Sequence, residues 1–280
     1  MKVKHFNTTV VFTENDYEFW STTFMKKLLS LILTFSVCFA LHALTPEEVL
    51  EISRTQTSID TMASEAQVSV QRPVGTTIEM LSLREYTGYD ASNQQANMIV
   101  FNAPAKYKNT RFLMVTRKDG SMDQRVYLPS MGKSRRVTAE TEGSGSFFGT
   151  DFSYSDIAFL SRAVALDTHT FLDEEEYNGK ECYVIQSIPK TAEGYAKCIN
   201  KISKADNMLQ TAEFYDKTGK LVKRLEFLDY KDVSGVLTPF TVKMTTLATN
   251  TATVISIKKI EYGLKIPTAV FTTRYLETGR

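Results

Sequence analysis

The chain has 280 residues, and its 33 lysines and arginines nearly balance its 32 aspartates and glutamates. Beyond residue 43 the balance is complete, because the first 43 residues hold four of the basic and three of the acidic side chains, which leaves 29 of each. A neutral chain argues against nucleic acid as a partner and offers no electrostatic attraction to anionic lipid surfaces. It is long enough for one domain with a sizeable core.

The first predicted element is an export signal at residues 25–43. Met25 is followed by two lysines, an apolar run at residues 28–41 and then His42-Ala43. This order is typical of a secretory signal peptide, and the run is too short to span a bilayer comfortably. Cleavage is expected after Ala43 or after Ala40. We expect Met25 to be the true start and interpret residues 1–24 as an upstream extension added in error.

Cys38, inside the apolar run, permits a second interpretation, in which the thiol is acylated and anchors a lipoprotein in the membrane. A lipobox needs a small residue immediately before the cysteine, but Val37 stands there, and the residues after Cys38 stay apolar. We therefore expect an exported, periplasmic protein, with the lipid-anchored form as the alternative.

Residues 44–280 are expected to form a single, mainly β domain that opens with a helix. Thr45 is a natural N-cap, Pro46 suits the first helical position, and Glu48 completes a capping box. The apolar spacing then predicts that the helix continues through Ile59 and Met62.

The rest of the chain predicts a large antiparallel sheet or barrel. Apolar and polar residues alternate with a period of two, and turn residues separate about ten such stretches. Two short helical segments are predicted at residues 155–164, capped by Ser155, and near the C-terminus at 267–277. Because these helices are few, either they plug the apolar face of the sheet or a ligand shares it.

The stretch GSGSFFGTDFSYSDI at residues 143–157 combines flexibility with large apolar side chains. Glycines allow the backbone to bend, whereas exposed aromatic side chains are unfavourable. Two interpretations remain open: a mobile flap that packs into an apolar face and can leave it, or a buried crossover that plugs one end of a barrel. The aromatic residues concerned are Phe147, Phe148, Phe152 and Tyr154.

Catalysis is not expected. His169 is the only histidine beyond residue 43, and a lone histidine in a loop between elements is more often structural than a general base. Asp151 and Asp156 could in principle form an acid–base pair, but turn and helix capping explains them better. The glycine-rich stretch matches neither a nucleophile elbow nor a dinucleotide fingerprint, so no cofactor is expected.

Residues 44–280 contain two cysteines, Cys182 and Cys198, which flank a predicted hairpin loop. In an exported protein such a pair suggests a disulfide, and the alternative is two separate buried thiols. Two thiols and one histidine do not make a zinc site by their spacing, so no metal is expected.

Three blocks of the sequence resemble the LolA-like outer-membrane lipoprotein-sorting proteins, in particular a divergent branch typical of spirochaetes. They are ANMIVFNAPAKYKNTRFLM at 96–114, RVYLPSMGKSRRV at 125–137 and GSFFGTDFSYSDI at 145–157. The hairpin EFYDKTGKLVKRLEF and the ending VFTTRYLE are also similar to that family, so the resemblance covers nearly all of residues 44–280.

The resemblance implies a half-open antiparallel barrel, LolA/LolB-like, with a few helices covering its mouth and an apolar interior for acyl chains. It implies a lipidated protein or phospholipid as cargo, an inner-membrane transporter and an outer-membrane acceptor as partners. The residues expected to form the cavity and flap are Phe101, Phe112, Met114, Tyr127, Phe147, Phe148, Phe152, Tyr154 and Phe159. Candidates for a headgroup or lid contact are Arg111, Arg135 and Arg136.

The expected function is therefore that of a periplasmic carrier of acylated cargo, without covalent chemistry. The alternatives are an accessory binding module of a membrane lipid exporter and a lipid-acting hydrolase that uses Asp151, Asp156 or His169. Fold resemblance alone does not settle which cargo is carried.

Overall fold

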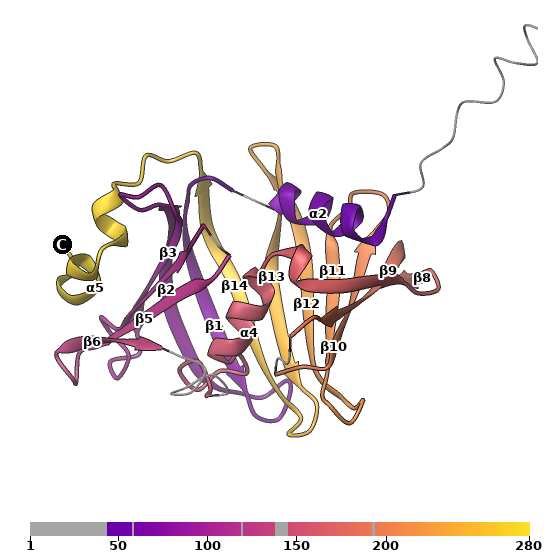
Figure 1. Ribbon diagram of the computed structural model, residues 1–280. Coiled ribbons are helices and arrows are strands. Elements are labelled where there is room, and N and C mark those ends of the chain that lie inside the picture. Colours follow the sequence, from indigo (N-terminus) through magenta and orange to yellow (C-terminus); the bar gives the residue numbers. More distant parts are fainter. Residues whose placement is uncertain (1–43, 58, 119, 138–144, 192–193) are drawn as a thin grey trace, which may run out of the picture. The chain divides into compact units, whose positions relative to one another are not determined.

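The computed structural model describes residues 44–57, 59–118, 120–137, 145–191 and 194–280. The chain divides into two compact units, Met1–Leu44 and Thr45–Arg280, and every described helix and strand lies in the second (Figure 1). The predicted signal peptide, Cys38 and the upstream extension lie outside the described residues. None of the described helices is long and apolar enough to cross a membrane.

Fourteen strands form one antiparallel sheet, in agreement with the alternation of apolar and polar residues in the sequence. The first six are β1 (Met62–Gln71), β2 (Thr77–Tyr89), β3 (Gln95–Ala103), β4 (Arg111–Thr116), β5 (Met122–Leu128) and β6 (Lys133–Val137). The others are β7 (Asp167–Phe171), β8 (Glu175–Tyr177), β9 (Lys180–Pro189), β10 (Lys197–Ser203), β11 (Leu209–Tyr215), β12 (Leu221–Val233), β13 (Val236–Thr246) and β14 (Thr251–Tyr262). Their order is β6-β5-β4-β3-β2-β1-β14-β13-β12-β11-β10-β9-β7, and β8 pairs with β9 beside this path.

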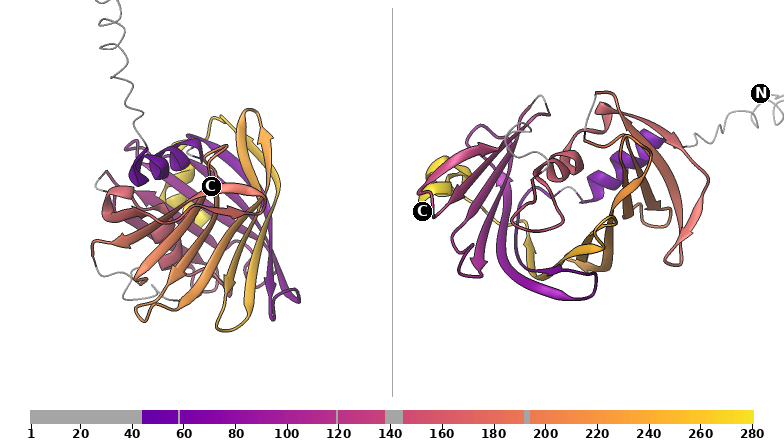
Figure 2. Two further views of the ribbon diagram at one scale, coloured as in Figure 1. Left: turned by 90° about the vertical axis from the view of Figure 1, so that its right-hand side faces the viewer. Right: turned by 90° about the horizontal axis from the view of Figure 1, so that it is seen from below.

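The helices are few and lie on both sides of the sheet. They are α2 (Pro46–Thr57), α4 (Tyr154–Ser161), the 3-10 turns η1 (Val164–Leu166) and η2 (Thr268–Phe271), and α5 (Thr273–Thr278). The sheet curves around α2 and α4, whereas α5 lies on the other side (Figure 2). We call the side that holds α2 and α4 the inner face, and the opposite side the outer face.

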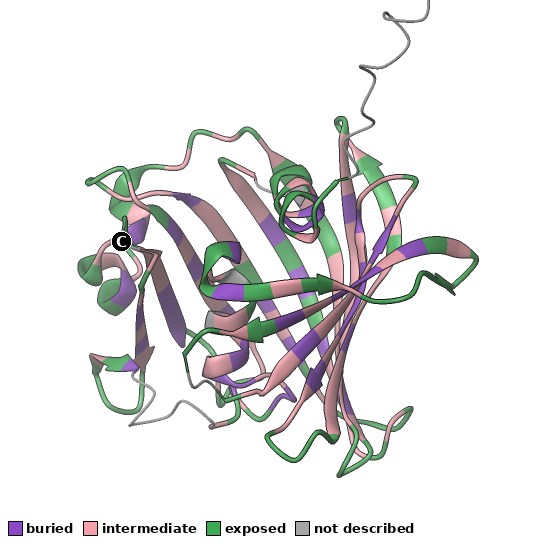
Figure 3. Ribbon diagram, turned by 45° about the vertical axis from the view of Figure 1, so that its right-hand side comes forward, coloured by how far each residue is buried: buried purple, intermediate pink, exposed green. Residues whose placement is uncertain are grey.

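Strand β1 shows how the alternating sequence produces these faces. Ala66, Val68 and Val70 are buried, whereas Glu65, just before them, and Gln67, between the first two, are exposed, because successive side chains of a strand point to opposite faces. The buried positions of the central strands form bands that cross the sheet (Figure 3). β1 pairs with both β2 and β14, so its inner residues lie at the middle of the sheet.

Apolar clusters fill both faces. On the inner face, α2 packs Val49 and Leu50 against Ile185 and Ile202 of β9 and β10. On the outer face, Phe271 and Leu276 of the C-terminal segment pack on Ala96, Met98 and Leu113 of β3 and β4. The outer cluster places the predicted C-terminal helix where it covers strands rather than the mouth of the inner face.

Three details of the predicted elements are corrected. The first helix ends at Thr57. Met62 instead belongs to β1, where it pairs with Thr87 of β2 and Tyr262 of β14. The pairing with two neighbouring strands prevails over the helical spacing of the apolar residues. The cap of α4 is Ser153 rather than Ser155. Two of the strands beyond the expected ten, β7, which contains His169, and β8, lie in stretches interpreted as loops.

Candidate functional site

An apolar cavity of about 410 Å³ lies against the inner face of the sheet. Its volume falls within the range of about 300–1,000 Å³ that is usual for small-molecule sites. Strands β1 to β4, β13 and β14 supply most of its wall, and the segment at residues 147–157 closes one side. The lining residues are Ser64, Ala66, Val68, Leu81, Leu83, Glu85, Asn97, Ile99, Phe101, Phe112, Met114, Phe147, Thr150, Phe152, Ile157, Val242, Thr253, Ile255 and Ile257.

The aromatic segment that closes the cavity is a tight turn rather than an extended loop. The backbone N–H of Phe147 donates to the carbonyl of Phe152 at 2.7 Å, and that of Thr150 donates to the carbonyl of Phe147 at 3.1 Å. The two central residues, Phe148 and Gly149, have φ of 51° and 77°. Positive φ at both central positions defines a type I′ turn, and glycine accepts it without the steric cost of a side chain.

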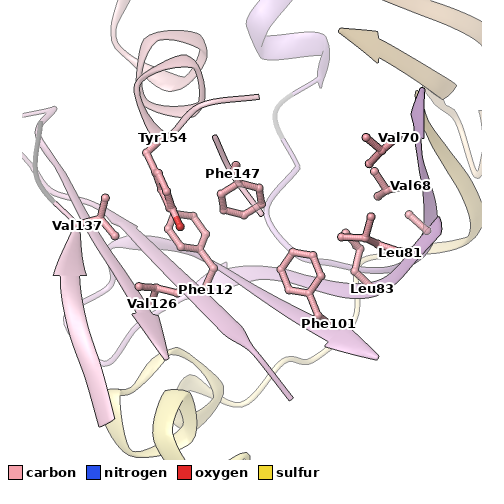
Figure 4. Close-up of a cluster of buried hydrophobic side chains, with 11 residues drawn as sticks. Val68, Val70, Leu81, Leu83, Phe101, Phe112, Val126, Val137, Phe147 and Tyr154 are labelled. Atoms are coloured by element: carbon pink, nitrogen blue, oxygen red, sulfur yellow. The ribbon is translucent and has the colours of Figure 1, made fainter. Parts of the chain in front are cut away.

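Rings from the turn and from the sheet pack together at this end of the cavity. The Phe147 ring meets Phe112 at a centroid distance of 5.1 Å, and Phe148 meets Phe101 at 4.6 Å. Tyr154, at the start of α4, lies 5.3 Å from Phe147. Figure 4 shows Phe147 and Tyr154 facing Phe112 and Phe101 across the space between α4 and the sheet. Edge-to-face contacts of this kind add stability beyond burial.

Asp151 anchors the turn to the sheet. Its carboxylate accepts hydrogen bonds from the hydroxyls of Thr246, Thr251 and Thr253 at 2.8, 2.5 and 2.8 Å. It also pairs with the guanidinium of Arg72 at 3.2 Å. These donors occupy both carboxylate oxygens, so Asp151 ties the turn to β13 and β14.

Asp156 anchors the beginning of α4. It completes a capping box with Ser153, as expected for an acid in the first turn of a helix. Lys223 Nζ donates to Asp156 Oδ2 at 2.6 Å and to the carbonyl of Asp151 at 2.9 Å, so one lysine ties both anchors together. The hydroxyl of Tyr195 donates to Asp156 Oδ1 at 2.5 Å. Burial and this carboxylate raise the pKa of Tyr195, which keeps the donor protonated.

Polar side chains gather at another part of the cavity wall. Asn97 Nδ2 donates to Glu85 Oε1 at 2.5 Å and to the hydroxyl of Thr87 at 3.0 Å. The hydroxyl of Ser64 donates to Glu85 Oε2 at 3.5 Å. Burial raises the pKa of Glu85, and these two hydrogen bonds oppose the shift.

A second hollow of about 520 Å³ adjoins this polar part. Asn97 and Met114 line both hollows, so they mark the boundary between them. The second hollow also contacts Glu51, Arg54 and Thr55 of α2. The inner face therefore offers an apolar space that continues into a polar one.

Five of the nine predicted cavity residues line the apolar cavity: Phe101, Phe112, Met114, Phe147 and Phe152. Phe148 and Tyr154 pack against the same aromatic cluster without lining the cavity. Phe159 lies elsewhere on the inner face, against Phe214 and Tyr195. Tyr127 was wrongly placed, because it belongs to the outer cluster and lies beneath Arg111.

The candidate arginines do not reach the cavity wall. Arg111 is buried on the outer face, where Nη1 donates to the carbonyls of Leu276 and Glu277 at 3.0 and 3.2 Å. It therefore holds α5 and not a helix that covers the cavity, which corrects the expected lid contact. Arg136 pairs with Asp123 at 3.0 Å, and Arg135 lies beside it in the edge strand β6.

Cys182 and Cys198 are both buried and unbonded, so the disulfide is corrected and the alternative of two separate thiols holds. Cys198 lies opposite Ser187 in the β9–β10 ladder, five residues beyond Cys182 along β9. That offset corresponds to about 16 Å, and an odd offset places the two side chains on opposite faces. A disulfide needs Cα atoms within about 7 Å.

His169 also has structural partners. Nδ1 lies 2.9 Å from the hydroxyl of Ser187, and Nε2 lies 2.9 Å from the carbonyl of Val164. Both ring nitrogens are thus used to hold η1 against β7 and β9.

Sequence reasoning missed the aliphatic wall and the polar cluster of the cavity. Ala66, Leu83 and Ile255 belong to strands that the alternation predicts, but alternation does not tell which face borders a cavity. Glu85 stands at an inward position of β2 between Leu83 and Thr87. An acidic residue at a position that the alternation assigns to the apolar face was the one sequence feature that indicated this polar cluster.

A family model described as that of an uncharacterized protein matches residues 93–278, which is more than half of the chain. The chain therefore belongs to that family. No curated protein matches the sequence.

Several solved structures share the fold. A DUF1329 family protein from Desulfovibrio piger has a TM-score of 0.74 at 24% identity, over 83% of this chain and 100% of that one. A putative outer membrane lipoprotein-sorting protein domain from Vibrio parahaemolyticus has a TM-score of 0.73 at 23% identity, with the same coverage of 83% and 100%. A LolA superfamily protein from Nitrosomonas europaea has a TM-score of 0.65 at 18% identity, again over 83% and 100%. The mainly β, open-sheet fold is confirmed, and the resemblance to LolA-like structures is confirmed at the level of the fold.

Proposed function

We propose that residues 44–280 form a periplasmic carrier that holds the acyl chains of lipoproteins or other lipids in the inner cavity. In this proposal residues 25–43 direct export, and the carrier moves its cargo toward the outer membrane. It binds without covalent chemistry, and it exchanges cargo with an inner-membrane transporter and an outer-membrane acceptor. The LolA-like fold supports a role in lipoprotein sorting or lipid binding.

The observation that carries the proposal is the apolar cavity with one aromatic side and one polar side. Each buried methylene contributes about 0.8 kcal/mol, so a chain of about fifteen carbons could contribute on the order of 12 kcal/mol before the costs of binding. An amphipathic cargo fits this change from apolar to polar lining, because its chain can lie among aliphatic residues while its headgroup meets polar ones.

The anchoring of the aromatic turn bears on how cargo enters. Asp151 holds the turn and Asp156 holds the start of α4, both with buried hydrogen bonds. We therefore favour the interpretation of the segment as a plug, and we propose that cargo enters and leaves through the polar hollow beside α2.

An accessory module of an exporter is the second candidate, and one observation favours it. Ile78 and Met80 on β2 are 60% and 47% exposed, although they are large and apolar. Two such residues are far less than the roughly 800 Å² per partner of a stable interface, so carriage is the better supported proposal.

The test is whether filling the cavity removes acyl binding. Ala66→Phe places a ring inside the cavity, and Gln67→Phe places the same ring on the exposed outer side of the same strand. With the full chain expressed and the exported protein purified, we expect Ala66→Phe to weaken binding of a fluorescent long-chain fatty acid by about tenfold or more, a loss of about 1.4 kcal/mol. Gln67→Phe should bind like the wild type.

Circular dichroism before and after heating would show that both variants are folded. Equal binding by wild type and Ala66→Phe would place the acyl chain elsewhere and reject the cavity as the site. Native mass spectrometry of the wild-type protein would then reveal the class of any lipid that co-purifies.

A further inference from the structure

Glu85 differs from every buried aspartate of the described residues. Those four aspartates each form an ion pair with a basic side chain: Asp123 with Arg136, Asp151 with Arg72, Asp156 with Lys223 and Asp167 with Arg162. Glu85 is half-buried on the cavity wall, and its partners are the neutral side chains of Asn97 and Ser64. Within the described part of the chain, no lysine or arginine pairs with it.

A carboxylate in this position is costly for a binding protein that only needs an apolar wall. Taking a charge out of water without a counter-ion is unfavourable, and proteins normally pair such charges. Burial raises the pKa of Glu85, because it disfavours the charged form of the carboxyl group. An unpaired acid in a cavity is therefore a candidate for ligand contact.

The hydrogen bonds of Glu85 leave room for another donor. Oε1 accepts from Asn97 at 2.5 Å, but Oε2 has only the long contact of 3.5 Å with the Ser64 hydroxyl. A carboxylate offers about four lone-pair positions, so Oε2 can accept further hydrogen bonds from the cavity side. Asn97, which lines both hollows, fixes the orientation of the carboxylate at their boundary.

The surrounding charges favour a cation over an anion at this point. Glu85 and Glu51 supply two carboxylates to the walls of the two hollows, and Arg54 supplies one guanidinium. Arg54 is already engaged, because its guanidinium donates to the carbonyl of Arg162. Burial lowers the pKa of Arg54, and the nearby carboxylates of Glu51 and Asp167 oppose that shift. Burial raises the pKa of Tyr262 of β14, and the nearby Glu85 adds to that shift, so Tyr262 supplies no positive charge.

We infer that Glu85, oriented by Asn97, receives the primary amine of an acylated ligand whose chain lies in the apolar cavity. This inference rests on the proposed function and specifies its cargo. An ammonium group supplies both the missing counter-ion and donors for Oε2. The shared chemistry is an amine close to acyl chains, and it has two sources: the headgroup of an aminophospholipid and the free α-amine of a diacylated lipopeptide.

The test compares acylated ligands with and without a primary amine. One pair is lysophosphatidylethanolamine and lysophosphatidylglycerol with the same acyl chain, and the other is a diacylated lipopeptide with its α-amine free or acetylated. Wild type, Glu85→Gln and the control Glu65→Gln are measured by calorimetry on the full exported protein. Glu65 belongs to the neighbouring strand, is about half exposed and pairs with Arg84 on the outer face, so its variant should behave like the wild type.

The expected result is an affinity about tenfold higher for the amine-bearing member of at least one pair, and loss of this preference in Glu85→Gln. The pair that shows the preference identifies the source of the amine. Equal affinities within both pairs, with acyl binding intact, would overturn the inference and leave the carrier proposal standing. If no acyl ligand binds at all, the carrier proposal fails as well.

Stability provides a readout that separates ligand contact from a merely structural role. Because the pKa of Glu85 is raised in the folded state, its neutral form stabilises the fold below the ordinary glutamate pKa of about 4.3, and this contribution is lost as the pH rises. Glu85→Gln should therefore gain stability relative to the ligand-free wild type as the pH rises above that value. A variant that is instead destabilised at neutral pH would show that Glu85 serves the fold and not the ligand.

Discussion

At the scale of single residues, buried aspartates and their partners hold the aromatic segment in place. Asp151 is nearly fully buried, and one guanidinium and three threonine hydroxyls surround its carboxylate. The residues that supply these donors lie before β2 or in β13 and β14, far from Asp151 in the sequence. Neither capping preference nor spacing could therefore predict this arrangement.

Asp151→Asn should lower the free energy of unfolding by about 2 kcal/mol. The substitution removes the charge that pairs with Arg72 and converts part of the carboxylate into a donor facing threonine hydroxyls. Arg72 is partly exposed and can be rehydrated, so the loss stays below that of a fully buried pair. Urea denaturation measures the effect. Asp173→Asn, at an exposed position, is the control and should change stability by less than about 0.5 kcal/mol.

The two cysteines should behave as inert thiols. Cys182 is 0% and Cys198 is 2% exposed, and burial raises the pKa of both thiols, so little reactive thiolate forms. We expect neither to react with a thiol reagent in the folded protein and both to react after unfolding. Labelling of neither thiol after unfolding would show that the two cysteines form a disulfide.

At the scale of elements, the C-terminal segment serves the outer face of the sheet. Leu276 of α5 is fully buried against β3 and β4, and Arg111 binds the carbonyls at the end of that helix. Glu277 accepts hydrogen bonds from the backbone N–H of Ser134, at 3.2 Å, and from its hydroxyl, at 2.6 Å. Ser134 belongs to the edge strand β6, so α5 also satisfies part of an exposed edge.

Leu276→Ala should lower the free energy of unfolding by about 3 kcal/mol while leaving acyl binding unchanged. The substitution creates a cavity in the outer cluster, and the sheet separates that cluster from the inner cavity. Leu247→Ala, at a position 37% exposed, is the matched control and should have a small effect. Loss of acyl binding in a folded Leu276→Ala protein would contradict the separation of the two faces.

The aromatic segment shows how sequence and structure complement each other at this scale. The glycine and aromatic composition predicts a bent, apolar element, and the structure contains one. Its local conformation depends on Gly149 at φ of 77° and on the hydrogen bonds between Phe147 and Phe152. Its packing depends on Phe101 and Phe112, which lie on strands that precede it by more than thirty residues.

At the scale of the whole sheet, curvature creates the site. Strands β1, β2 and β14 are central in the order, and their inner side chains meet the segment at residues 147–157 across the cavity. Sheets twist and coil because of backbone sterics, so a long antiparallel sheet of this kind encloses space on one side. The helices α2 and α4 fill only part of that space.

A bound acyl ligand should stabilise the folded protein. A ligand present at about one hundred times its Kd contributes about 2.7 kcal/mol, which corresponds to a rise in Tm of roughly 5–10 °C for a domain of this size. Differential scanning calorimetry with and without a long-chain fatty acid measures the shift. An unchanged Tm for the wild type, or an equal rise for Ala66→Phe, would count against binding in this cavity.

The sequence by itself determined the mainly β class, the capping box at Thr45, most strand positions and the five aromatic and methionine residues that line the cavity. These features depend on local chemistry: period-two alternation, turn residues and helix caps, all of which act over a few neighbouring positions. The tertiary structure decided which strand face borders the cavity, that Tyr127 and Arg111 belong to the outer face, that the cysteines stay apart and that Glu85 lacks a basic partner. Those outcomes depend on register and curvature, which bring together residues from distant strands, and a one-residue shift in register reverses the face of every side chain.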